Sequence, residues 1–492
     1  MKQKKLAMLL AMLLLASSMA ACGETKEAET TADTAAAQTE TEKETTELEA
    51  RLALPDNLPD KDFEGYDFRV LTRNRDDFIN DVGVELELTG DVTDDAIYNR
   101  NKAVEERFNI VISGEYAENN GTSIHAAVQA AVMAGDDTYD LAENQVTQMA
   151  KVCTTGNYLD WYTQLPYVDL TQPWYIGNAA EALSVNGHAY AMIGEYNLDV
   201  LRFTYCMYYN QDIAIEYDFE NIFTVVKEGR WTYDYLKTLA DTVYVDNNAD
   251  GVKDFGDRLA ISGDPYSAVV TYQYAFDNPV ASLNEEGLPY LSLNREKAHD
   301  IVVKLNALYW ESIGGLTEGW GSGSDTWVSG NLLCYTGLFS SATGYGDLEF
   351  DFSIIPYPKY DEDQDSYYTM SDGAHGTLMV PITISDPERT SIIIEALNAE
   401  TYKSVVPAYF ETALKDRYSR DAESAEMLDL LMGCRVFDFG YMYDTGIAFS
   451  IQRMVSANSS NTESEYVSQI TKAETEYAKV IEEYMKLEES LG

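Results

Sequence analysis

The sequence lacks the motifs of the common enzyme classes. It contains no GxSxG, HExxH or GxxxxGK[ST] pattern, and only four histidines stand among its 492 residues. These absences argue against serine hydrolases, zinc peptidases and P-loop nucleotidases. A glycoside hydrolase needs only two carboxylates, so 83 acidic residues neither support nor exclude one. A binding protein is therefore expected ahead of an enzyme, and no organic cofactor is expected.

Basic residues are also scarce. The chain has 34 Lys and Arg residues against 83 Asp and Glu residues, a formal net charge of -49. A polyanion repels nucleic acids and anionic lipid headgroups, which argues against DNA, RNA and polybasic membrane docking. We interpret the acidity as solubility of an exposed surface, with a specific cationic partner as the alternative.

Cysteine pairs at metal-binding or redox spacing are absent. None of the five cysteines belongs to a CxxC pair, so zinc and thioredoxin-type chemistry have no support. One or two disulfides are compatible with an exported protein, but the spacing defines no pairing. Four cysteines lie in apolar surroundings and are expected to be small buried residues: Cys153, Cys206, Cys334 and Cys434.

What the sequence does contain begins with an export signal. The basic start MKQKK precedes an apolar run over 6–16, which suits a signal peptide and is too short to span a membrane. The segment MAAC at 19–22 resembles a bacterial lipobox, although Met19 departs from the commoner leucine. The resemblance implies a signal peptide over 1–21 and a diacylglyceryl thioether on Cys22. An ordinary signal peptide with an incidental cysteine is the alternative.

Residues 22–55 are expected to form a disordered acidic tether. They contain no aromatic residue and consist largely of Glu, Thr, Ala and Lys, so they bury too little apolar surface to fold. No later segment has 18 consecutive apolar residues, so the lipid is the only membrane attachment expected. An anchor, a tether and a large domain are typical of a protein held at the extracellular face of the cell membrane.

The remaining chain alternates between strand and helix patterns from residue 66 onward. This alternation predicts an α/β fold with a mostly parallel sheet. The length exceeds what one hydrophobic core usually supports, so two lobes are expected. The predicted strands cover 66–72, 109–112, 139–141, 350–356 and 377–381. The predicted helices cover 94–108, 122–134, 387–401, 423–432 and 462–489.

The order of several segments resembles the extracellular solute-binding proteins of ABC importers, in the carbohydrate-type class that includes maltose-binding proteins. Together the segments cover nearly all of 56–492, and their order, with the lipobox and tether before them, carries the resemblance. In chain order they read VLTRN, AIYNRNKAVEERFNI, YDLAENQ, YLDWYTQLPYVDLTQPWY, NGHAYAMIGEYN, CMYYNQDIAIEY, GRWTYDYLKTLA, DFSIIPYPKY and PAYFETALKDRYSRDAESAEMLDLL.

The resemblance implies a two-lobed fold of the type II periplasmic-binding-protein class, with strands that cross a hinge. The chain would leave the first lobe near Pro166, return near Pro356 and cross again near residue 410. The first lobe would then comprise 56–165 plus 356–410, and the second 166–355 plus 411–492.

The same resemblance implies a function. The protein would act as a monomer that captures a carbohydrate, an oligosaccharide ahead of smaller sugars, and passes it to ABC permease subunits. A peptide or another small polar solute is the alternative ligand. A surface adhesin or sensor that feeds no transporter is the alternative from a different class.

Candidate ligand residues follow from two rules. Ligands of open α/β sheets bind beyond the carboxyl ends of strands, and sugar rings stack on aromatic side chains. Trp320 and Tyr345 lie in glycine-rich loops and are the aromatic candidates, whereas Trp231 opens a helix and is expected in the core. The polar candidates are Thr72, Arg73, Asn74, Asn144, Gln145, Glu195, Tyr196, Asn197, Ser371 and Asp372.

One segment matches a calcium-binding loop. Residues 246–257 read DNNADGVKDFGD and fit the spacing D-x-[DN]-x-[DN]-G with an acid at position twelve. Asp257 replaces the usual glutamate there, and no clear helix follows, so we expect an isolated structural calcium site. An Asx-rich turn without an ion is the alternative. The expected ligands are Asp246, Asn248, Asp250, Val252 through its carbonyl, Asp254 and Asp257.

Overall fold

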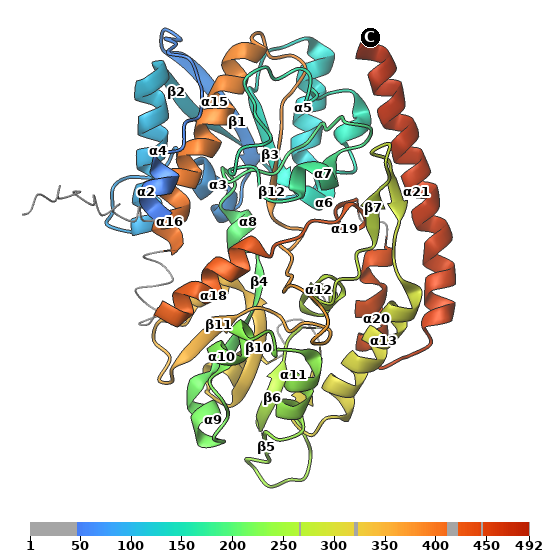
Figure 1. Cartoon of the computed structure of the whole chain (residues 1–492). Helices are drawn as coiled ribbons and strands as arrows, with labels where there is room; N and C mark the ends of the chain where they lie inside the picture. Colours follow the sequence, from blue (N-terminus) through green and yellow to red (C-terminus); the bar gives the residue numbers. More distant parts are fainter. Residues whose placement is uncertain (1–46, 265–266, 319–322, 411–421, 444–445, 492) are drawn as a thin grey trace, which may run out of the picture. The chain divides into compact units, whose positions relative to one another are not determined.

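The computed structural model describes residues 47–264, 267–318, 323–410, 422–443 and 446–491. The predicted signal peptide, Cys22, most of the predicted tether and Trp320 lie outside these residues. The described part folds around two sheets, which Figure 1 shows in its upper and lower halves. Within the described ranges, no helix has both the length and the apolar character needed to cross a bilayer.

The first sheet has four strands in the order β12-β3-β1-β2. Strand β1 pairs in parallel with β2 and β3, while β12 runs antiparallel to β3. The last four residues of β1 are all buried, as expected for a central strand covered on both faces. The strands predicted over 66–72, 109–112 and 377–381 are confirmed, and β2 extends further than predicted. The strand predicted over 139–141 is misplaced, because β3 begins only at Leu141. Their bounds are β1 Tyr66–Arg73, β2 Ile110–Ala117, β3 Leu141–Gln145 and β12 Gly376–Met379.

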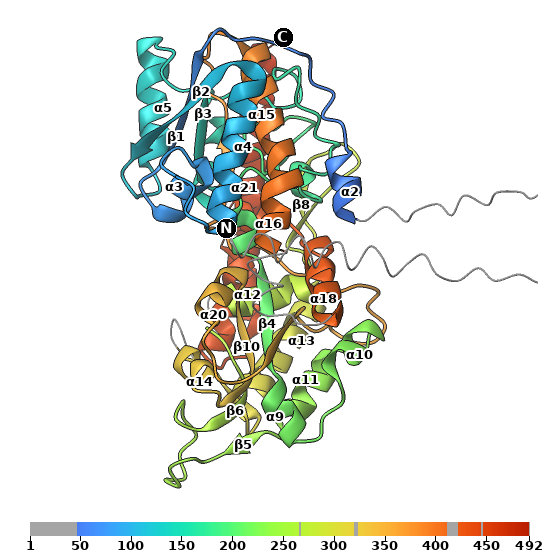
Figure 2. The ribbon, with the colours of Figure 1, turned by 90° about the vertical axis from the view of Figure 1, so that its left-hand side faces the viewer.

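Helices cover both faces of the first sheet, α4 (Val92–Phe108) and α15 (Pro387–Glu400) on one face and α5 (Ser123–Ala134) on the other (Figures 1 and 2). Helix α4 starts where the Asp91 carboxylate accepts hydrogen bonds from the backbone N–H groups of Thr93 and Asp94, each at 3.0 Å. All three helices match the predicted ones to within two residues.

The second sheet is mixed. Its strands follow the order β11-β4-β10-β6-β5, with β9 beside β6, and only the β10–β6 and β6–β9 pairs are parallel. The prediction of a mostly parallel sheet is therefore wrong for this half. All six residues of β4 are buried, so its own pattern does not encode the direction of its partners. The bounds are β4 Tyr205–Asn210, β5 Tyr244–Val245, β6 Arg258–Ser262, β9 Gly315–Leu316, β10 Leu332–Leu338 and β11 Phe352–Ile355.

Helices of the second half lie around this sheet, and β7 and β8 form a separate two-stranded hairpin beside α21 (Figure 1). Their apolar faces join the buried core, in which Trp231 is fully enclosed and donates from Nε1 to the Pro356 carbonyl at 2.8 Å. The core position predicted for Trp231 is confirmed. The bounds are α9 Gln211–Glu216, α10 Ile222–Lys227, α11 Tyr233–Ala240, α12 Ser267–Ala275, β7 Ala281–Leu283, β8 Pro289–Leu291, α13 Arg295–Asn306, α14 Ser324–Val328 and α18 Ala422–Gly433.

The segment 166–203 packs on the first sheet. Nε1 of the buried Trp174 donates to Glu395 of α15 at 2.9 Å, and Met192 forms an antiparallel bridge with β12. Thr204 then bridges Ser371, and β4 begins at the next residue. These contacts favour a passage between the two sheets at Thr204 rather than near Pro166. The lobe boundaries stay predictions.

The end of the predicted tether is helical. Residues Glu47–Leu52 form α2, and the guanidinium carbon of Arg51 lies 4.7 Å from the centre of the Tyr402 ring. The prediction of disorder up to residue 55 is wrong for this short stretch, because its contact with a distant aromatic ring is not visible in local composition.

The C-terminal helix α21 (Thr462–Leu491) runs alongside elements of both halves (Figure 1). The Thr462 hydroxyl lies 2.7 Å from His299 in α13, and Thr154, beyond the first sheet, donates to Glu483 at 2.6 Å. The predicted packed stripe is confirmed by Tyr466, Tyr477 and Tyr484, which are buried. The four described cysteines are buried free thiols, as expected from their apolar surroundings: Cys153, Cys206, Cys334 and Cys434.

Candidate functional site

Three strand ends of the first sheet meet at Arg73. This residue ends β1, and its Nη1 donates a hydrogen bond to the side-chain oxygen of Gln145, which ends β3. Its Nη2 donates at 2.6 Å to the side-chain oxygen of Asn119, which follows β2. Asn74 is exposed, and its N–H donates to the Ala117 carbonyl at 2.8 Å. The predicted residues Arg73, Asn74 and Gln145 therefore lie together, as the strand-end rule requires.

A second arginine extends this group toward the second sheet. Arg75 Nε donates to the Asp77 carboxylate at 2.5 Å, and its guanidinium carbon lies 5.6 Å from the centre of the Phe203 ring. Burial acts to lower the pKa of Arg75, but the hydrogen bond to Asp77 and the charges of Asp199 and Asp372 outweigh it. The pKa of Arg75 therefore lies above its ordinary value.

Asp372 joins the two sheets. Its carboxylate accepts a hydrogen bond at 2.9 Å from the hydroxyl of Tyr205, the first residue of β4, and its N–H donates to the Phe203 carbonyl at 2.8 Å. We call Arg73, Asn74, Arg75, Gln145 and Asp372 the strand-end group. It offers charged and neutral hydrogen-bonding groups, which suits a polar solute.

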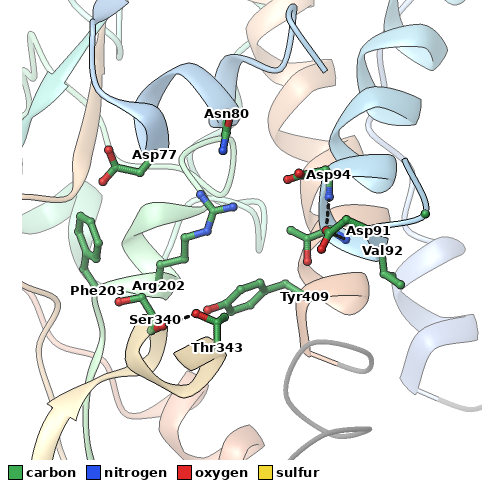
Figure 3. A pocket seen from close by; sticks show the side chains of 12 residues that line it. Asp77, Asn80, Asp91, Val92, Asp94, Arg202, Phe203, Ser340, Thr343 and Tyr409 are labelled. Carbon is green, nitrogen blue, oxygen red and sulfur yellow. Dashed lines mark hydrogen bonds between the residues drawn. The ribbon is translucent and has the colours of Figure 1, made fainter. Parts of the chain in front are cut away.

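A cavity of about 490 Å³ adjoins this group through Asp77 and Phe203 (Figure 3). Helix α3 (Asp76–Val82) and the start of α4 form one side, whereas the end of α8 (Asp199–Arg202) and the 3-10 helix η3 (Phe339–Gly344) form the other. Helix η3 directly follows β10 of the second sheet, so both halves contribute to the walls. The lining residues are Asp77, Asn80, Gly90, Asp91, Val92, Thr93, Asp94, Arg202, Phe203, Ser340, Thr343 and Tyr409.

The charged residues that line the cavity are mainly acidic. Figure 3 shows Arg202 between the α3 residues and the Tyr409 ring, and its guanidinium carbon lies 5.9 Å from that ring centre. Arg202 also donates to Asp81 at 2.9 Å. Burial raises the pKa of Asp94, and the charge of Asp91 adds to this effect. Together with Phe203, these groups can bond hydroxyls and contact the face of a ring.

Three fully buried carboxyl groups accompany the strand-end group, and we call Asp81, Glu143 and Asp199 the buried carboxyl layer. Glu143 accepts hydrogen bonds from the Thr72 hydroxyl at 3.0 Å and from the Asn197 side-chain amide. Burial raises the pKa of Asp81 to about 6, and those of Glu143 and Asp199 well above their ordinary values. The predicted ligand residues Thr72 and Asn197 therefore bond protein groups in the interior.

Other predicted residues are buried in the same region. Glu195 forms a buried ion pair with Arg435, with 3.6 Å between nitrogen and oxygen. The guanidinium carbon of Arg100 lies 4.7 Å from the centre of the Tyr196 ring. The side chain of Asn144 is buried and donates to a backbone carbonyl at 3.3 Å. In the described fold Glu195, Tyr196 and Asn144 are therefore buried against other protein groups, and their role in ligand binding stays a prediction.

Two further candidates lie in packed surroundings. The Tyr345 ring is 9% exposed and packs edge-on against Tyr208, with ring centres 5.1 Å apart. It also contacts Trp327, so the structure favours a core role over sugar stacking. Ser371 is buried, and its hydroxyl donates to the Val200 carbonyl at 2.9 Å.

None of the residues that line the cavity is among the predicted ligand residues. Ser340 and Thr343 follow β10, so the strand-end rule applied to that strand would have found them. Phe203 and Arg202 precede a strand, and Tyr409 ends a helix, so no rule about strand ends points to them. Their convergence depends on the packing of distant segments.

The predicted calcium loop forms a surface turn between β5 and β6. One carboxylate oxygen of Asp246 accepts a hydrogen bond from the N–H of Gly251 at 2.9 Å, and its other oxygen is buried without a partner. Asn248 accepts from the N–H of Asp250 at 3.0 Å, and Asp250 accepts from that of Val252 at 2.7 Å. Gly251 has φ of 77°, which favours glycine at this turn.

The end of the loop is closed by Asp257. Its fully buried carboxylate accepts hydrogen bonds at 3.1 Å from the N–H groups of Asp254 and Asn247. Across the ranges that the structure describes, no three His, Cys, Asp or Glu side chains form a group that could hold a metal ion. The loop carboxylates instead bond backbone N–H groups, and calcium binding stays a proposal.

No protein-family model and no curated protein matches the sequence. Solved structures with a similar fold include the galacto-N-biose/lacto-N-biose I-binding protein of a Bifidobacterium longum ABC transporter with lacto-N-biose. It is 12% identical, covers 86% of this chain and 98% of its own, and has a TM-score of 0.54. An ABC substrate-binding protein from Listeria monocytogenes with cycloalternan is 13% identical, covers 84% and 99%, and has a TM-score of 0.52.

A third similar structure is UgpB from Mycobacterium tuberculosis with glycerophosphocholine. It is 14% identical, covers 86% of this chain and 99% of its own, and has a TM-score of 0.53. At these identities the likeness concerns the fold. The chain therefore has the α/β fold of type II periplasmic binding proteins, which sugar-binding ABC solute-binding proteins share, as the order of its sequence segments predicts.

Proposed function

We propose that this chain captures a carbohydrate outside the cell and delivers it to an ABC importer. The observation that carries the proposal is the cavity and strand-end group, to which both halves of the fold contribute. A solute that touches both halves binds one relative arrangement better than another, and this difference in affinity drives closure. The similar structures named above are binding proteins, so binding is proposed rather than catalysis.

A small polar solute other than a sugar is the second candidate. It is favoured by the similar structure that holds glycerophosphocholine, and by the charged groups around the cavity. A surface adhesin would need no cavity of this size, so it is the less favoured alternative.

Calorimetric titration with a panel of neutral and charged oligosaccharides tests the proposal. Phe203→Ala should weaken binding of a true ligand by about 1–3 kcal/mol if its ring contacts the sugar. Phe219→Ala is a matched control, because Phe219 is also partly buried but stacks on Tyr217 within the second half. Equal loss of affinity in both variants, or no binding by any sugar or small polar solute, contradicts solute capture in this cavity.

We also propose a lipid anchor at Cys22 and a location at the extracellular face of the cell membrane. The support is the basic and apolar start followed by MAAC at 19–22. Cys22→Ala should release the protein from washed membranes, because the thioether has no other attachment point. A matched variant, Cys153→Ala, keeps Cys22 and should stay with the membrane fraction. Retention of the Cys22→Ala protein on membranes contradicts the anchor.

A structural calcium ion in the loop 246–257 is a further proposal. It is supported by the sequence spacing and by the buried, unpartnered oxygen of Asp246. The ion would accept this oxygen as a ligand and fix the turn between β5 and β6.

A further inference from the structure

Arg73 is a buried cation whose described partners are all neutral. It is 6% exposed, and its two Nη atoms bond the amide oxygens of Gln145 and Asn119. Its Nε is buried without a hydrogen-bond partner. The nearby acids are engaged elsewhere: Asp77 bonds Arg75, and Asp199 accepts the Gly376 N–H at 2.8 Å.

Other arginines in the described ranges differ from Arg73. Three of them also have one buried nitrogen without a hydrogen-bond partner but lie within ion-pair distance of a carboxylate: Arg258, Arg389 and Arg435. Arg69 pairs with Asp140 at 2.8 Å, and Arg202 pairs with Asp81 at 2.9 Å. Arg100 lacks a carboxylate partner, but each of its three nitrogens donates a hydrogen bond. Arg73 has neither a carboxylate partner nor a complete set of hydrogen bonds.

This arrangement is costly unless something compensates it. Arginine keeps its charge in proteins, and a buried charge without a partner destabilises the fold. The chain has 83 acidic residues, so an acidic partner for Arg73 would be easy to supply from the protein itself. A missing internal partner at the edge where strand ends meet points to a partner that comes from outside.

The position of Arg73 suits an anion. The amide oxygens of Gln145 and Asn119 hold the guanidinium plane in one orientation, which lowers the entropy that binding must overcome. A guanidinium edge matches the planar carboxylate closely. The charge of Asp77 acts on Arg73, and it would repel a phosphate dianion more strongly than a carboxylate monoanion.

We propose that the captured solute carries a carboxylate, as the uronic acid units of acidic oligosaccharides do, and that Arg73 binds this carboxylate. The inference rests on the proposed function and names the class of its substrate. Arg73 supplies charge at the end of β1, while the neighbouring cavity receives the neutral part of the sugar.

The test compares acids with their neutral esters. Wild-type protein and Arg73→Gln are titrated with oligosaccharides of galacturonate, glucuronate and mannuronate, with their methyl esters, with malto-oligosaccharides and with hexose phosphates. At least one uronate should bind the wild type roughly 10- to 100-fold more tightly than its methyl ester, the range of a charge-assisted hydrogen bond. In Arg73→Gln this ratio should fall to about 1.

Stability separates this role from a structural one. Arg73→Gln should unfold at the same temperature as the wild type or a higher one, because the substitution removes an uncompensated buried charge. Arg69→Gln is the control on the same strand: it breaks ion pairs with Asp137 and Asp140 and should lower the unfolding temperature while the preference for acid over ester remains.

The other outcomes overturn distinct statements. Equal affinity for acid and ester, or a preference that persists in Arg73→Gln, overturns the role of Arg73 and leaves the proposed function intact. A preference for hexose phosphate that depends on Arg73 overturns the carboxylate class. If no carbohydrate in the panel binds, the proposed function fails together with the inference.

Discussion

The strand-end group and the buried carboxyl layer are neighbours with different surroundings, because the layer takes Glu143 from β3 but Asp81 and Asp199 from the helices α3 and α8. Thr72 and Arg73 are neighbours in β1, yet Thr72 bonds Glu143 in the interior, whereas Arg73 meets the ends of the adjacent strands. Successive side chains of a strand point to opposite faces, which separates the two sets. In the layer each carboxylate accepts hydrogen bonds from the protein, while Arg73 keeps an unbonded Nε. The unbonded Nε, at the edge where strand ends meet, distinguishes Arg73 as a candidate ligand residue.

The largest change in stability is expected when a buried ion pair of the interior is broken. Glu195→Ala leaves the buried Arg435 without its ion-pair partner and should lower the free energy of unfolding by about 3–5 kcal/mol. Urea-induced unfolding followed by fluorescence measures the loss. The double variant Glu195→Leu with Arg435→Met removes both charges and should recover most of it. A loss below about 1 kcal/mol in Glu195→Ala would place Glu195 with the ligand residues instead.

The calcium loop contains a second side chain with a buried atom that has no hydrogen-bond partner, Asp246. Calcium at one hundred times its dissociation constant should stabilise the protein by about 2.7 kcal/mol. The double variant Asp246→Ala with Asp250→Ala should abolish the rise in melting temperature. Asp241→Ala, with Asp241 exposed at the end of α11 outside the loop, is the control and should keep it. Unchanged melting of the wild type with calcium and with chelator, with no bound calcium by elemental analysis, contradicts the site.

The pH dependence of stability tests how Glu143, a member of the buried carboxyl layer, titrates. Burial raises the pKa of Glu143 well above its ordinary value, so the folded protein binds a proton that the unfolded chain has released. Stability is therefore lost as pH rises through the folded-state pKa of Glu143. Glu143→Gln cannot ionise and should gain about 1–3 kcal/mol relative to the wild type at high pH.

The matched measurement is the difference in unfolding temperature between Glu143→Gln and the wild type from pH 4 to pH 9. The difference should be near zero at the acid end and should grow with pH. Asp365→Asn, at an exposed position, serves as a control for the removal of one negative charge. A difference that is constant over the pH range would show that Glu143 does not titrate in this way.

The smallest expected effect on stability belongs to the strand-end group. Asn74→Ala alters an exposed side chain and should change the free energy of unfolding by less than about 0.5 kcal/mol. The same substitution should weaken binding of the solute by about 0.5–1.5 kcal/mol, the range for one hydrogen bond. Calorimetry and urea unfolding measure the two quantities separately. A loss of stability without a loss of affinity would show that Asn74 has a structural role and does not bind the solute.

The elements of the first sheet could be predicted because their signals are local. Ile97, Val104 and Phe108 recur on one face of α4, and acidic residues stand at its start, so the helix was visible without any distant contact. The second sheet could not be predicted in the same detail. Its pairing joins β4 to β10 and β11 across long stretches of chain, and the residues of β4 are uniformly buried.

The residues of the candidate site also differ in how far the sequence could predict them. Arg73 and Gln145 were identified because they end strands, and the parallel arrangement then brings them together. Glu195 and Tyr196 met a similar rule but are enclosed by Arg435 and Arg100, which lie far away in the sequence. Burial of this kind depends on the whole fold, so loop position alone does not separate ligand residues from structural ones.

The contacts of α21 make one cysteine a reporter of local opening. The Cys153 thiol is buried beside the hydroxyls of Tyr443 and of Tyr484 in α21, at 3.6 and 3.8 Å, and burial raises its pKa to about 11. A thiol reagent can reach it only while the C-terminal half of α21 is detached. The labelling rate of Cys153, relative to that of an unfolded chain, therefore measures the free energy that holds this half of the helix in place.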